Sequence, residues 1–591
     1  MRVYALYVSY TARRKVGGRI YLEERESYRE GGKVRNRFLR YLGVEGEVPG
    51  QPRPALHLLD KIRPAGSSRA GDVALLWAIA QDLKLPATID TICGRYSSHE
   101  GPSPGVLLTI WAINRVLHPE SATQLERWVP TTDLPRLAGI RPDAFTKDAF
   151  LTCLDRVCGE DPDIGGLTDR TERLDEELFR AWRERHPLPV EESEVFAYDL
   201  TSVLFFGVSC PLAELGYNAR ETKDQLQVNL ALLVTRRERQ PVTHAVFEGS
   251  RHGVATVRNF LVRVVRLGRR DAEKGLVPEG GTLIWDRGVV SKDHVEAVES
   301  AGWKLVCGLP KTLGAVKEVL DRVEVPWRPE CVVRVTKTTT IYAVETTAEV
   351  YGSRRRLVVY TNMSRAQRER DQRNEALARI GPELDKLGKE GAGWSEAKLH
   401  EKIRGVVGPW GEFLEVRVRR KGDGPRVVWR LHQQALRMAE RGDGKWVLLA
   451  TDPKPTVKEV VESYLEKDFI EKVFRRMKTE EELEPVRHRL ERRVRAYLFV
   501  LTLAYRLWAA LQWYVESRGK PEWGNPWEAS EDLLKALGRV ERVEVALGRQ
   551  QRIWYLNLLK ETKERLKKLG YRELLSEVIE TAPPTRAPSG A

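Results

Sequence analysis

Hydrophobic and polar residues alternate near the start of the chain. Three runs, VYALYVSYT, RIYLEERESYR and KVRNRFLRYLG, follow a period of two and are separated by the glycine pairs at 17–18 and 31–32. Glycine pairs at such positions suit tight hairpins. The pattern predicts a small antiparallel β-meander over residues 1–50, ending in the Pro- and Gly-rich linker GVEGEVPGQPRP.

Apolar residues recur at a helical spacing from residue 68 to residue 185. Short runs with this period are separated by the turn signals GPSPG, HPES and PTTDLP. The pattern predicts a compact helical region over residues 60–185. A DNA-binding helix-turn-helix domain and a purely structural helical domain both fit this spacing.

The period changes from helical to extended near residue 194. Strand-like segments VFAYDLTSVLFF, QVNLALLVT, THAVFEG, GTLIWD and WKLVCGLP follow one another, with a helix predicted from Ser291. A strand, a helix and a strand in this order indicate a βαβ unit with a parallel pair. A later buried strand, KWVLLATD, precedes a helix that opens with a capping box at Thr456 and Glu459.

These patterns predict an α/β fold interrupted by an insertion. We predict an α/β domain from residues 190–310 and 441–515, a large, mostly β insertion at 311–440, and a C-terminal helical region with a tail at 516–591.

Composition narrows the class of protein. The 591 residues carry a formal net charge of +14, and the six cysteines form no C-x-x-C pair. A protein this basic usually binds a polyanion, of which nucleic acid is the commonest, although a solubilising surface has the same charge. The start of the chain has no signal-peptide core, and the most apolar stretch, 496–515, is interrupted by Arg506 and Gln512. We therefore expect a buried core helix and a cytoplasmic protein without membrane contact.

Two aspartates stand at the ends of apolar strand-like runs. Asp199 follows VFAY and Asp286 follows TLIW. Side chains at the strand ends of an open α/β sheet escape the packed interior while the strands hold them rigidly. One such aspartate is usually a helix cap or a turn residue, but two on adjacent strands favour a metal site.

The helix after the capping box places four residues on one narrow stripe. The four residues are Tyr464, Lys467, Glu471 and Lys478. Because a helix turns by about 100° per residue, their spacing puts them on the same side of it. They make a poor core but suit a DNA-facing surface, where the lysines contact phosphates and the carboxylate binds a metal. Asp468 lies near the stripe and is the local alternative to Glu471.

These residues resemble the signature of a known enzyme family. The DDE transposases of bacterial insertion sequences, in the insertion-sequence-four-like group, carry the pattern Tyr-x2-Arg-x3-Glu-x6-Lys around their third acid. This chain is similar, with Lys467 in the place of arginine, which keeps the charge but loses the bidentate fork. YDLTSVLFF, WDRGVVSKDHVEAV and the segment from LLATD to LTLAYRL also resemble the family.

The resemblance implies an RNase H-like catalytic fold and a function in DNA transposition. It implies that Asp199, Asp286 and Glu471 bind two divalent ions, normally Mg²⁺, with Mn²⁺ as a substitute. Such ions, roughly 3.5–4 Å apart, activate the attacking oxygen and stabilise the leaving one. The implied partners are double-stranded DNA, as transposon ends and target, and a second copy of the chain on the paired ends.

Further candidates surround the acids. The segment 472–495 contains nine Lys or Arg against five Glu, which indicates either DNA contacts at Arg475 and its neighbours or a salt-bridged pair of helices. Arg287 is a candidate contact to the cut strand or a partner of a nearby acid. Trp327 and Trp429 are candidates for stacking on a distorted base, with core packing as the alternative.

Three functions fit these observations. The first is a cut-and-paste transposase that cleaves at the terminal inverted repeats of its element and joins them to target DNA. The second is a nuclease of the same fold, such as a resolvase, that cuts without joining, and the third is a domesticated DNA-binding protein. The presence of all three acids disfavours the third. Because residues 1–50 carry eleven Lys or Arg against six Glu, we expect recognition of the DNA ends to lie within residues 1–185.

Overall fold

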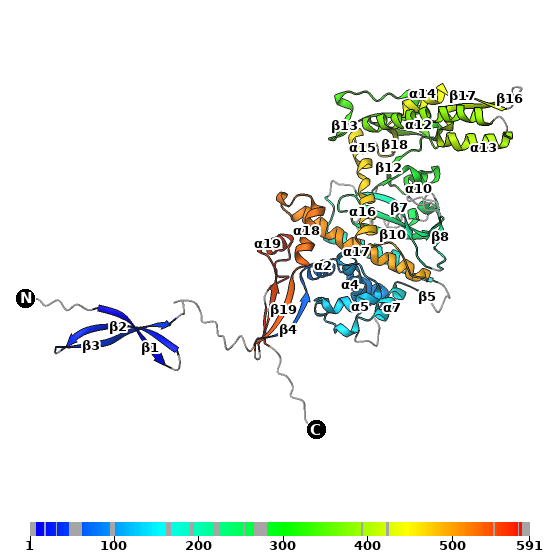
Figure 1. Cartoon of the computed structure of the whole chain (residues 1–591). Coiled ribbons are helices and arrows are strands. Elements are labelled where there is room, and N and C mark those ends of the chain that lie inside the picture. Colours follow the sequence, from blue (N-terminus) through cyan, green and yellow to red (C-terminus); the bar gives the residue numbers. More distant parts are fainter. Residues whose placement is uncertain are drawn as a thin grey trace, which may run out of the picture. The chain divides into compact units, whose positions relative to one another are not determined.

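A computed structural model gives the fold of the chain (Figure 1). It describes residues 8–16, 19–30, 32–45, 62–94, 101–160, 167–189, 194–207, 209–216, 224–251, 255–258, 260–264, 281–391, 394–420, 425–547, 550–576 and 578–581. Contacts between residues divide the chain into two compact units: one of residues 1–67, 543–554 and 577–591, and one of residues 68–542 and 555–576. The six-part division expected from the sequence remains a prediction.

The first unit contains the predicted meander. Strands β1 (Val8–Val16), β2 (Arg19–Glu30) and β3 (Lys33–Val44) form a three-stranded antiparallel sheet. The start of the predicted first strand and most of the predicted linker lie outside the described residues.

The C-terminal region contains strands that were not expected. Four strands form a second sheet in the order β21 (Val578–Thr581), β20 (Gln550–Leu556), β19 (Glu541–Leu547) and β4 (Ile62–Arg69). The prediction of helices alone over residues 516–591 is therefore wrong for these strands, although α18 (Pro526–Leu537) and α19 (Lys560–Leu569) are helical. In the sequence, β19 is marked by the apolar residues Val543, Val545 and Leu547, which alternate with polar ones. The predicted tail lies almost wholly outside the described residues.

The second unit is built on a large mixed sheet. Its strands, in sheet order, are β10 (Pro241–Glu248), β9 (Leu226–Thr235), β7 (Val195–Leu204), β11 (Thr282–Trp285), β12 (Lys304–Gly308), β18 (Lys445–Ala450), β15 (Ser353–Asn362), β14 (Thr340–Val350) and β13 (Val332–Val335), with β8 (Glu214–Leu215) beside β9. The pairs β7–β11 and β11–β12 are parallel, and the other pairs are antiparallel. The predicted βαβ unit is thus present, with α10 (Lys292–Ser300) between β11 and β12.

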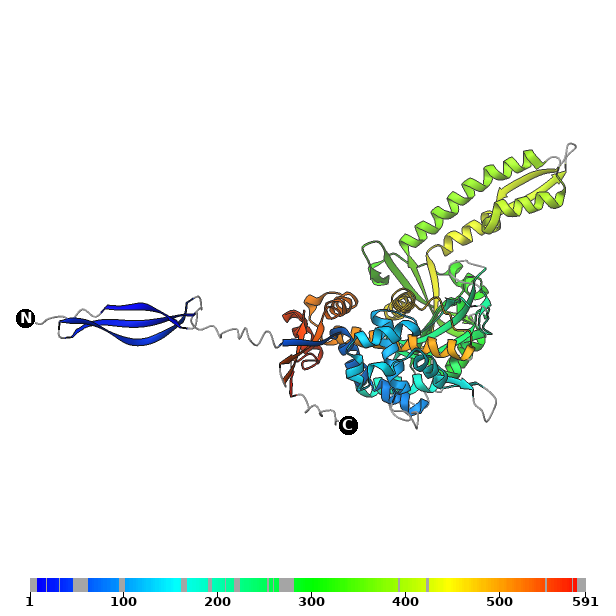
Figure 2. The same ribbon diagram turned by 60° about the horizontal axis from the view of Figure 1, so that its bottom comes forward.

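The predicted insertion differs from expectation in two ways. Strands β13, β14 and β15 do not form a separate domain but extend the main sheet beyond β18. The segment after β15 is largely helical: α12 (Met363–Glu390) and α13 (Glu396–Val407) pack with the β16 (Leu414–Arg420)–β17 (Pro425–Leu431) hairpin around a core of their own (Figure 2). The expectation of a mostly β insertion is therefore wrong.

The physical reason lies in the spacing of the apolar residues of α12. Ala376, Ile380, Leu384 and Leu387 are buried at intervals of three and four, which is a helical stripe within an Arg- and Glu-rich segment. The remaining helices of this region are α11 (Gly314–Arg322) and α14 (Gln433–Gly442).

The helical region at 60–185 shares one hydrophobic core with the rest of the second unit. Its helices are α2 (Gly71–Asp82), α3 (Leu85–Cys93), α4 (Pro104–Leu117), α5 (Ala122–Trp128), α6 (Leu134–Ala138), α7 (Lys147–Val157) and α8 (Thr171–Arg185). A short strand pair, β5 (Cys158–Glu160) and β6 (Leu167–Asp169), lies between α7 and α8.

The centre of this core is α17 (Glu491–Arg518), against which α2, α4, α7 and α18 pack (Figure 1). This helix is long and apolar enough to cross a membrane, but 94% of its most apolar window is buried inside the protein. The predicted core helix is therefore confirmed.

Candidate active site

Asp199 and Asp286 lie level on neighbouring parallel strands. β7 and β11 are paired from Val195 opposite Thr282 to Ala197 opposite Ile284. The same register, continued by two residues, brings Asp286 opposite Asp199. Side chains that are level on parallel strands point to the same face, and neighbouring strands are about 4.8 Å apart. The topology therefore brings the two predicted aspartates together.

The two aspartates differ in their position along the strands. Asp286 follows the last residue of β11, as expected. Asp199 lies in the middle of β7, which runs to Leu204 because β9 pairs with it along its whole length. The apolar run VFAY marks only the buried half of that strand, so the expectation that Asp199 closes it is wrong.

Asp286 is held by the helix that crosses this face of the sheet. Its Oδ1 accepts a hydrogen bond from the Tyr464 hydroxyl at 3.0 Å and from the backbone N–H of Arg287 at 2.8 Å. The Lys467 ammonium lies 3.8 Å from the same oxygen. The side chain of Asp286 is nevertheless half exposed, so its carboxylate is oriented without being buried.

The helix predicted after the capping box is formed by two consecutive helices. The capping box at Thr456 and Glu459 is present and starts α15 (Val457–Glu466). A turn at Lys467, which keeps right-handed helical dihedral angles, connects it to α16 (Asp468–Thr479). α16 packs against β7 and carries Glu471 in its first turn.

A cavity of about 370 Å³ lies between β7 and α16. Asp199 lines it from the strand, while Glu471, Phe474, Arg475 and Lys478 line it from the helix. These four occupy helical positions i, i+3, i+4 and i+7, which form one face. Asp468, the alternative to Glu471, is not among the residues that line the cavity. The third predicted acid therefore shares a pocket with the first.

The electrostatics of the pocket penalise an ionised Asp199. Burial raises its pKa to about 6, and the carboxylates of Asp286 and Glu471 act in the same direction. The backbone N–H of Leu200, which donates to Asp199 Oδ1 at 2.8 Å, and the Lys467 ammonium lower the pKa but do not compensate fully. A cation close to Asp199 would remove this penalty.

The three acids do not form a closed ligand set. Within the described part of the chain, no group of three or more His, Cys, Asp or Glu side chains is arranged to hold a metal ion. Asp286 is directed to Tyr464 and Lys467, and Glu471 is exposed on α16. The structure thus gathers the acids on one face of the sheet without bringing their carboxylates to a common point.

The predicted DNA-facing stripe is turned largely toward the protein. Tyr464 is only 5% exposed and belongs to an apolar cluster with Ile284 and Val460. Lys478 donates to the backbone oxygen of Ser202 at 2.6 Å and pairs with Glu484 at 3.0 Å. Tyr464, Lys467 and Lys478 therefore contact the sheet and its loops in this structure, and their assignment as DNA contacts stays a prediction.

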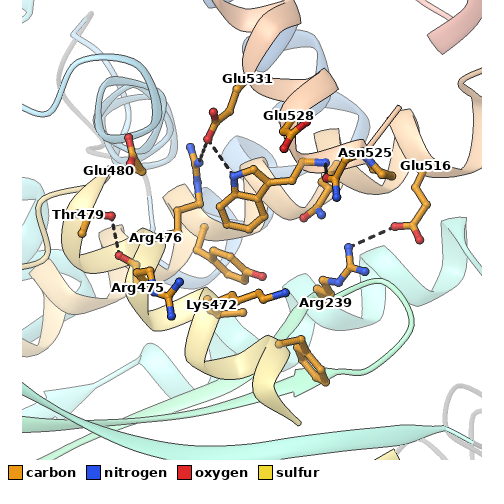
Figure 3. A pocket seen from close by; sticks show the side chains of 16 residues that line it. Arg239, Lys472, Arg475, Arg476, Thr479, Glu480, Glu516, Asn525, Glu528 and Glu531 are labelled. Atoms are coloured by element: carbon orange, nitrogen blue, oxygen red, sulfur yellow. Dashed lines mark hydrogen bonds and ion pairs between the residues drawn. The ribbon is translucent and has the colours of Figure 1, made fainter. Parts of the chain in front are cut away.

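The exposed cations of α16 lie on its other edge. Lys472 and Arg475 are exposed and, among the described residues, neither forms an ion pair. Both line a second pocket of about 470 Å³ between α16, α17 and α18. Figure 3 shows Lys472 pointing across this pocket toward Arg239, which pairs with Glu516 at 3.3 Å.

Arg475 connects the two pockets. Arg475 and Thr479 line both of them, and they lie one turn apart on α16. Arg475 was a predicted DNA contact, whereas Lys472 was not singled out. The sequence feature that could have identified Lys472 is the excess of Lys and Arg over Glu in residues 472–495.

The remaining predicted residues lie farther from the pocket. Arg287 is exposed in the turn after Asp286. Trp429 packs against Gly381 of α12 and donates from Nε1 to Asp385 at 2.7 Å, which supports the core-packing interpretation. Trp327 is 69% exposed, so its role as a stacking residue stays a prediction.

Comparisons with known proteins leave the family open. No protein-family model matches the chain, and no curated protein matches it. A cryo-EM structure of the piggyBac transposase synaptic complex with hairpin DNA covers 88% of this chain and 88% of its own, at 10% identity and a TM-score of 0.35. The Mos1 transposase paired-end complex with the left transposon end covers 36% of this chain and 60% of its own, at 12% identity and a TM-score of 0.14. Likenesses this weak decide neither the fold nor the function of the chain.

Proposed function

We propose that the protein is a DNA transposase that cleaves DNA at the ends of its element and joins those ends to target DNA. One observation carries the proposal: Asp199 and Asp286 are level on adjacent parallel strands, and Glu471 shares a pocket with Asp199. Three acids that are 87 and 185 residues apart in sequence are thereby gathered on one face of the sheet. The resemblance to DDE transposases at Tyr464, Lys467, Glu471 and Lys478 assigns the chemistry.

We infer that the catalytic part has an RNase H-like fold. Strands β7, β9 and β10 are antiparallel neighbours in the sheet, with the two-residue β8 between β7 and β9 in the chain. β11 and β12 then continue the sheet on the other side of β7, parallel to it. Such an order, with acids on the first and fourth strands and on a later helix, is the arrangement that the resemblance implies.

The donor set suits divalent magnesium. Carboxylate oxygens are the ligands that Mg²⁺ prefers, with water and substrate phosphate completing the shell. The raised pKa of Asp199 is the mark of a buried carboxylate without enough positive charge around it. Asp199, Asp286 and Glu471 would hold the metal. When bound, two such ions activate the attacking oxygen and stabilise the leaving one, and Mn²⁺ can replace them.

The other residues of the site position groups and bind the backbone of DNA. The Tyr464 hydroxyl orients Asp286. The Lys467 ammonium balances the charge of the Asp286 carboxylate when no metal is bound. Lys472 and Arg475, exposed beside the pocket, are suited to phosphate contacts. Arg287 is placed to contact the strand near Asp286.

The reaction itself tests the proposal. Purified protein is incubated with duplexes that carry the terminal repeats of its element, with Mg²⁺ and a second target duplex, and the products are mapped at nucleotide resolution. We expect cuts at the repeat ends and covalent joining to the target. Cuts without joining would support a nuclease, and binding without cuts would support a DNA-binding protein.

We further propose that the protein acts in the cytoplasm. We also propose that two protomers act on paired ends, because both ends of the element must be joined to one target. Light scattering of the protein with end duplexes measures the stoichiometry. One protomer on each isolated end, with no species that contains two ends, would contradict pairing.

A further inference from the structure

The sheet of β1, β2 and β3 has two chemically different faces. In its antiparallel register Arg25 lies between Tyr10 and Phe38, and Glu23 lies opposite Tyr41. Opposed residues of neighbouring strands point to the same side. One side therefore carries an aromatic ring from every strand. We call this side, with Tyr10, Tyr21, Phe38 and Tyr41, the ring face.

The rings of this face are open to solvent. Tyr10 is 39% exposed, Phe38 is 56% exposed and Tyr41 is 47% exposed. The rings of Tyr21 and Tyr41 lie 6.0 Å apart, so they form a neighbouring pair. Large apolar side chains gathered on one exposed face mark an interaction surface.

The outward charge of the ring face is positive. Its acid, Glu23, is only 7% exposed and is paired with Arg25 at 2.8 Å and with Arg14 at 3.7 Å. Arg29 is exposed on the same side, opposite Val34. Arginines therefore lie between and beside the rings, while the acid is covered.

Two acids of the opposite face are paired with arginines. Glu24 pairs with Arg40 at 2.6 Å, and Glu26 pairs with Arg37 at 2.6 Å. The same register places Lys15, Lys33 and Tyr28 on this face. The two faces therefore differ in their number of rings and not in the sign of their charge.

We propose that the ring face binds single-stranded nucleic acid, with unpaired bases stacked on the rings and phosphates beside Arg14, Arg25 and Arg29. Aromatic side chains stack on any base, because every base has a π-face, and a positive groove or face attracts the backbone. In a duplex these π-faces are covered by neighbouring base pairs, so the rings favour an unpaired strand.

This site lies outside the catalytic pocket and uses none of its residues, so it stands or fails independently of the proposed function. The full-length protein is titrated into a labelled oligothymidylate of about 16 nucleotides and, separately, into a duplex of equal length, and binding is followed by fluorescence anisotropy. The variants are Phe38→Ala and Tyr41→Ala, with Phe38→Tyr as the conservative replacement. Val34→Ala is the matched control, because it removes an exposed apolar side chain of the same face without removing a ring.

We expect each alanine variant to bind the single strand roughly 5- to 150-fold more weakly, equivalent to 1–3 kcal/mol for a stacked base. Phe38→Tyr and Val34→Ala should stay close to the wild type, and duplex binding should change little. Circular dichroism verifies that the variants are folded.

Three results would overturn the proposal. The first is unchanged single-strand binding by both alanine variants. The second is an equal loss of single-strand and duplex binding, which would make the face a general DNA contact. The third is a loss of self-association in Phe38→Ala, or of binding to anionic vesicles, without a loss of single-strand binding, which would identify a second copy or a membrane as the occupant.

Discussion

At the scale of single residues, the Tyr464 hydroxyl connects a buried ring to an exposed catalytic candidate. It donates to Asp286 Oδ1 at 3.0 Å. Tyr464→Phe keeps the ring in its cluster, so we expect the free energy of unfolding to fall by only about 0.5–1.5 kcal/mol. Cleavage should fall severalfold, and the Mg²⁺ concentration for half-maximal cleavage should rise, because Asp286 loses the group that orients it.

Tyr360 supplies the matched control for this measurement. Its ring is buried in the same cluster, 6.4 Å from that of Tyr464. Tyr360→Phe also removes a phenolic hydroxyl, and we expect it to leave the Mg²⁺ titration unchanged. If the two variants have the same titration curve, Tyr464 is a packing residue and does not position Asp286.

Asp199 predicts a pH dependence of stability. Its pKa is raised from 3.8 to about 6, so between these values the native protein holds a proton that the unfolded chain has released. This group therefore makes stability fall as the pH rises through that window. In EDTA at about pH 7.5, Asp199→Asn should unfold at a higher temperature than the wild type, and the difference should shrink near pH 4. A variant that is less stable than the wild type at the higher pH would show that the native carboxylate is not penalised.

The sequence marks the candidate acids by the apolar runs before them, but it does not show which surface the helical stripe faces, so its assignment to DNA stays a prediction. Asp199 and Asp286 follow apolar runs that mark them in the sequence, but the continuation of β7 beyond Asp199 depends on its pairing with β9. The helical stripe of Tyr464, Lys467 and Lys478 was assigned to DNA because its residues are polar. The polar end of a long side chain can also bind another part of the protein. The Tyr464 ring is buried while its hydroxyl donates to Asp286, and Lys478 donates to the backbone oxygen of Ser202 in β7. Sequence gives the stripe but not the surface it faces.

At the scale of elements, α16 and the turn before it present different cations to the sheet and to solvent. Lys467 and Lys478 contact the protein, whereas Lys472 and Arg475 are exposed. Each phosphate contact that is removed should lower the slope of log affinity against log salt by about 0.9. We therefore expect the double variant Lys472→Ala, Arg475→Ala to lower the slope for end duplexes by roughly 1.8 without a large change in stability.

Lys478→Ala provides the contrasting control. It breaks the contacts with Ser202 and Glu484, so its main effect should be a lower unfolding temperature, with the salt slope unchanged. The opposite result would be a lower salt slope for Lys478→Ala and an unchanged slope for the double variant. It would show that Lys478 contacts DNA and that Lys472 and Arg475 do not.

The strands were easier to predict than the way they join. Strands β7, β9, β10, β11, β12 and β18 follow the expected apolar runs, and the capping box starts α15 as predicted. β18 pairs with β15 as well as with β12, so the predicted insertion extends the main sheet. These pairings depend on contacts between residues far apart in sequence. The strand β4 was missed because IRPAGSSR has neither alternation nor β-branched enrichment; it owes its conformation to its neighbour β19.

At the scale of the whole molecule, the helical region cannot be removed as a separate domain. Arg183 of α8 is buried and pairs with Glu238 at 2.9 Å and with Glu194. Deleting residues 1–185 would leave both carboxylates buried without their cation, a loss of about 3–5 kcal/mol for a broken pair of this kind. It would also remove the helices that cover α17.

Two truncations test this view. Deletion of residues 1–61 should leave cooperative unfolding of the remaining chain, whereas deletion of residues 1–185 should give an aggregated or unfolded product, as measured by calorimetry and light scattering. The shorter deletion is then the useful one for end recognition, and we expect it to weaken the preference for the terminal repeat over random duplex. A folded product from the longer deletion would contradict the single shared core.

The central claim is that Asp199, Asp286 and Glu471 form one metal-dependent cleavage site. The most direct measurement compares Mg²⁺-dependent cutting of end duplexes by Asp199→Asn, Asp286→Asn, Glu471→Gln and the neighbouring control Asp468→Asn, with duplex binding measured in parallel. We expect the first three variants to lose cutting while their binding stays within about twofold of the wild type, because phosphate contacts dominate affinity. Asp468→Asn should cut like the wild type. Near-normal cutting by Glu471→Gln together with loss in Asp468→Asn would contradict the central claim.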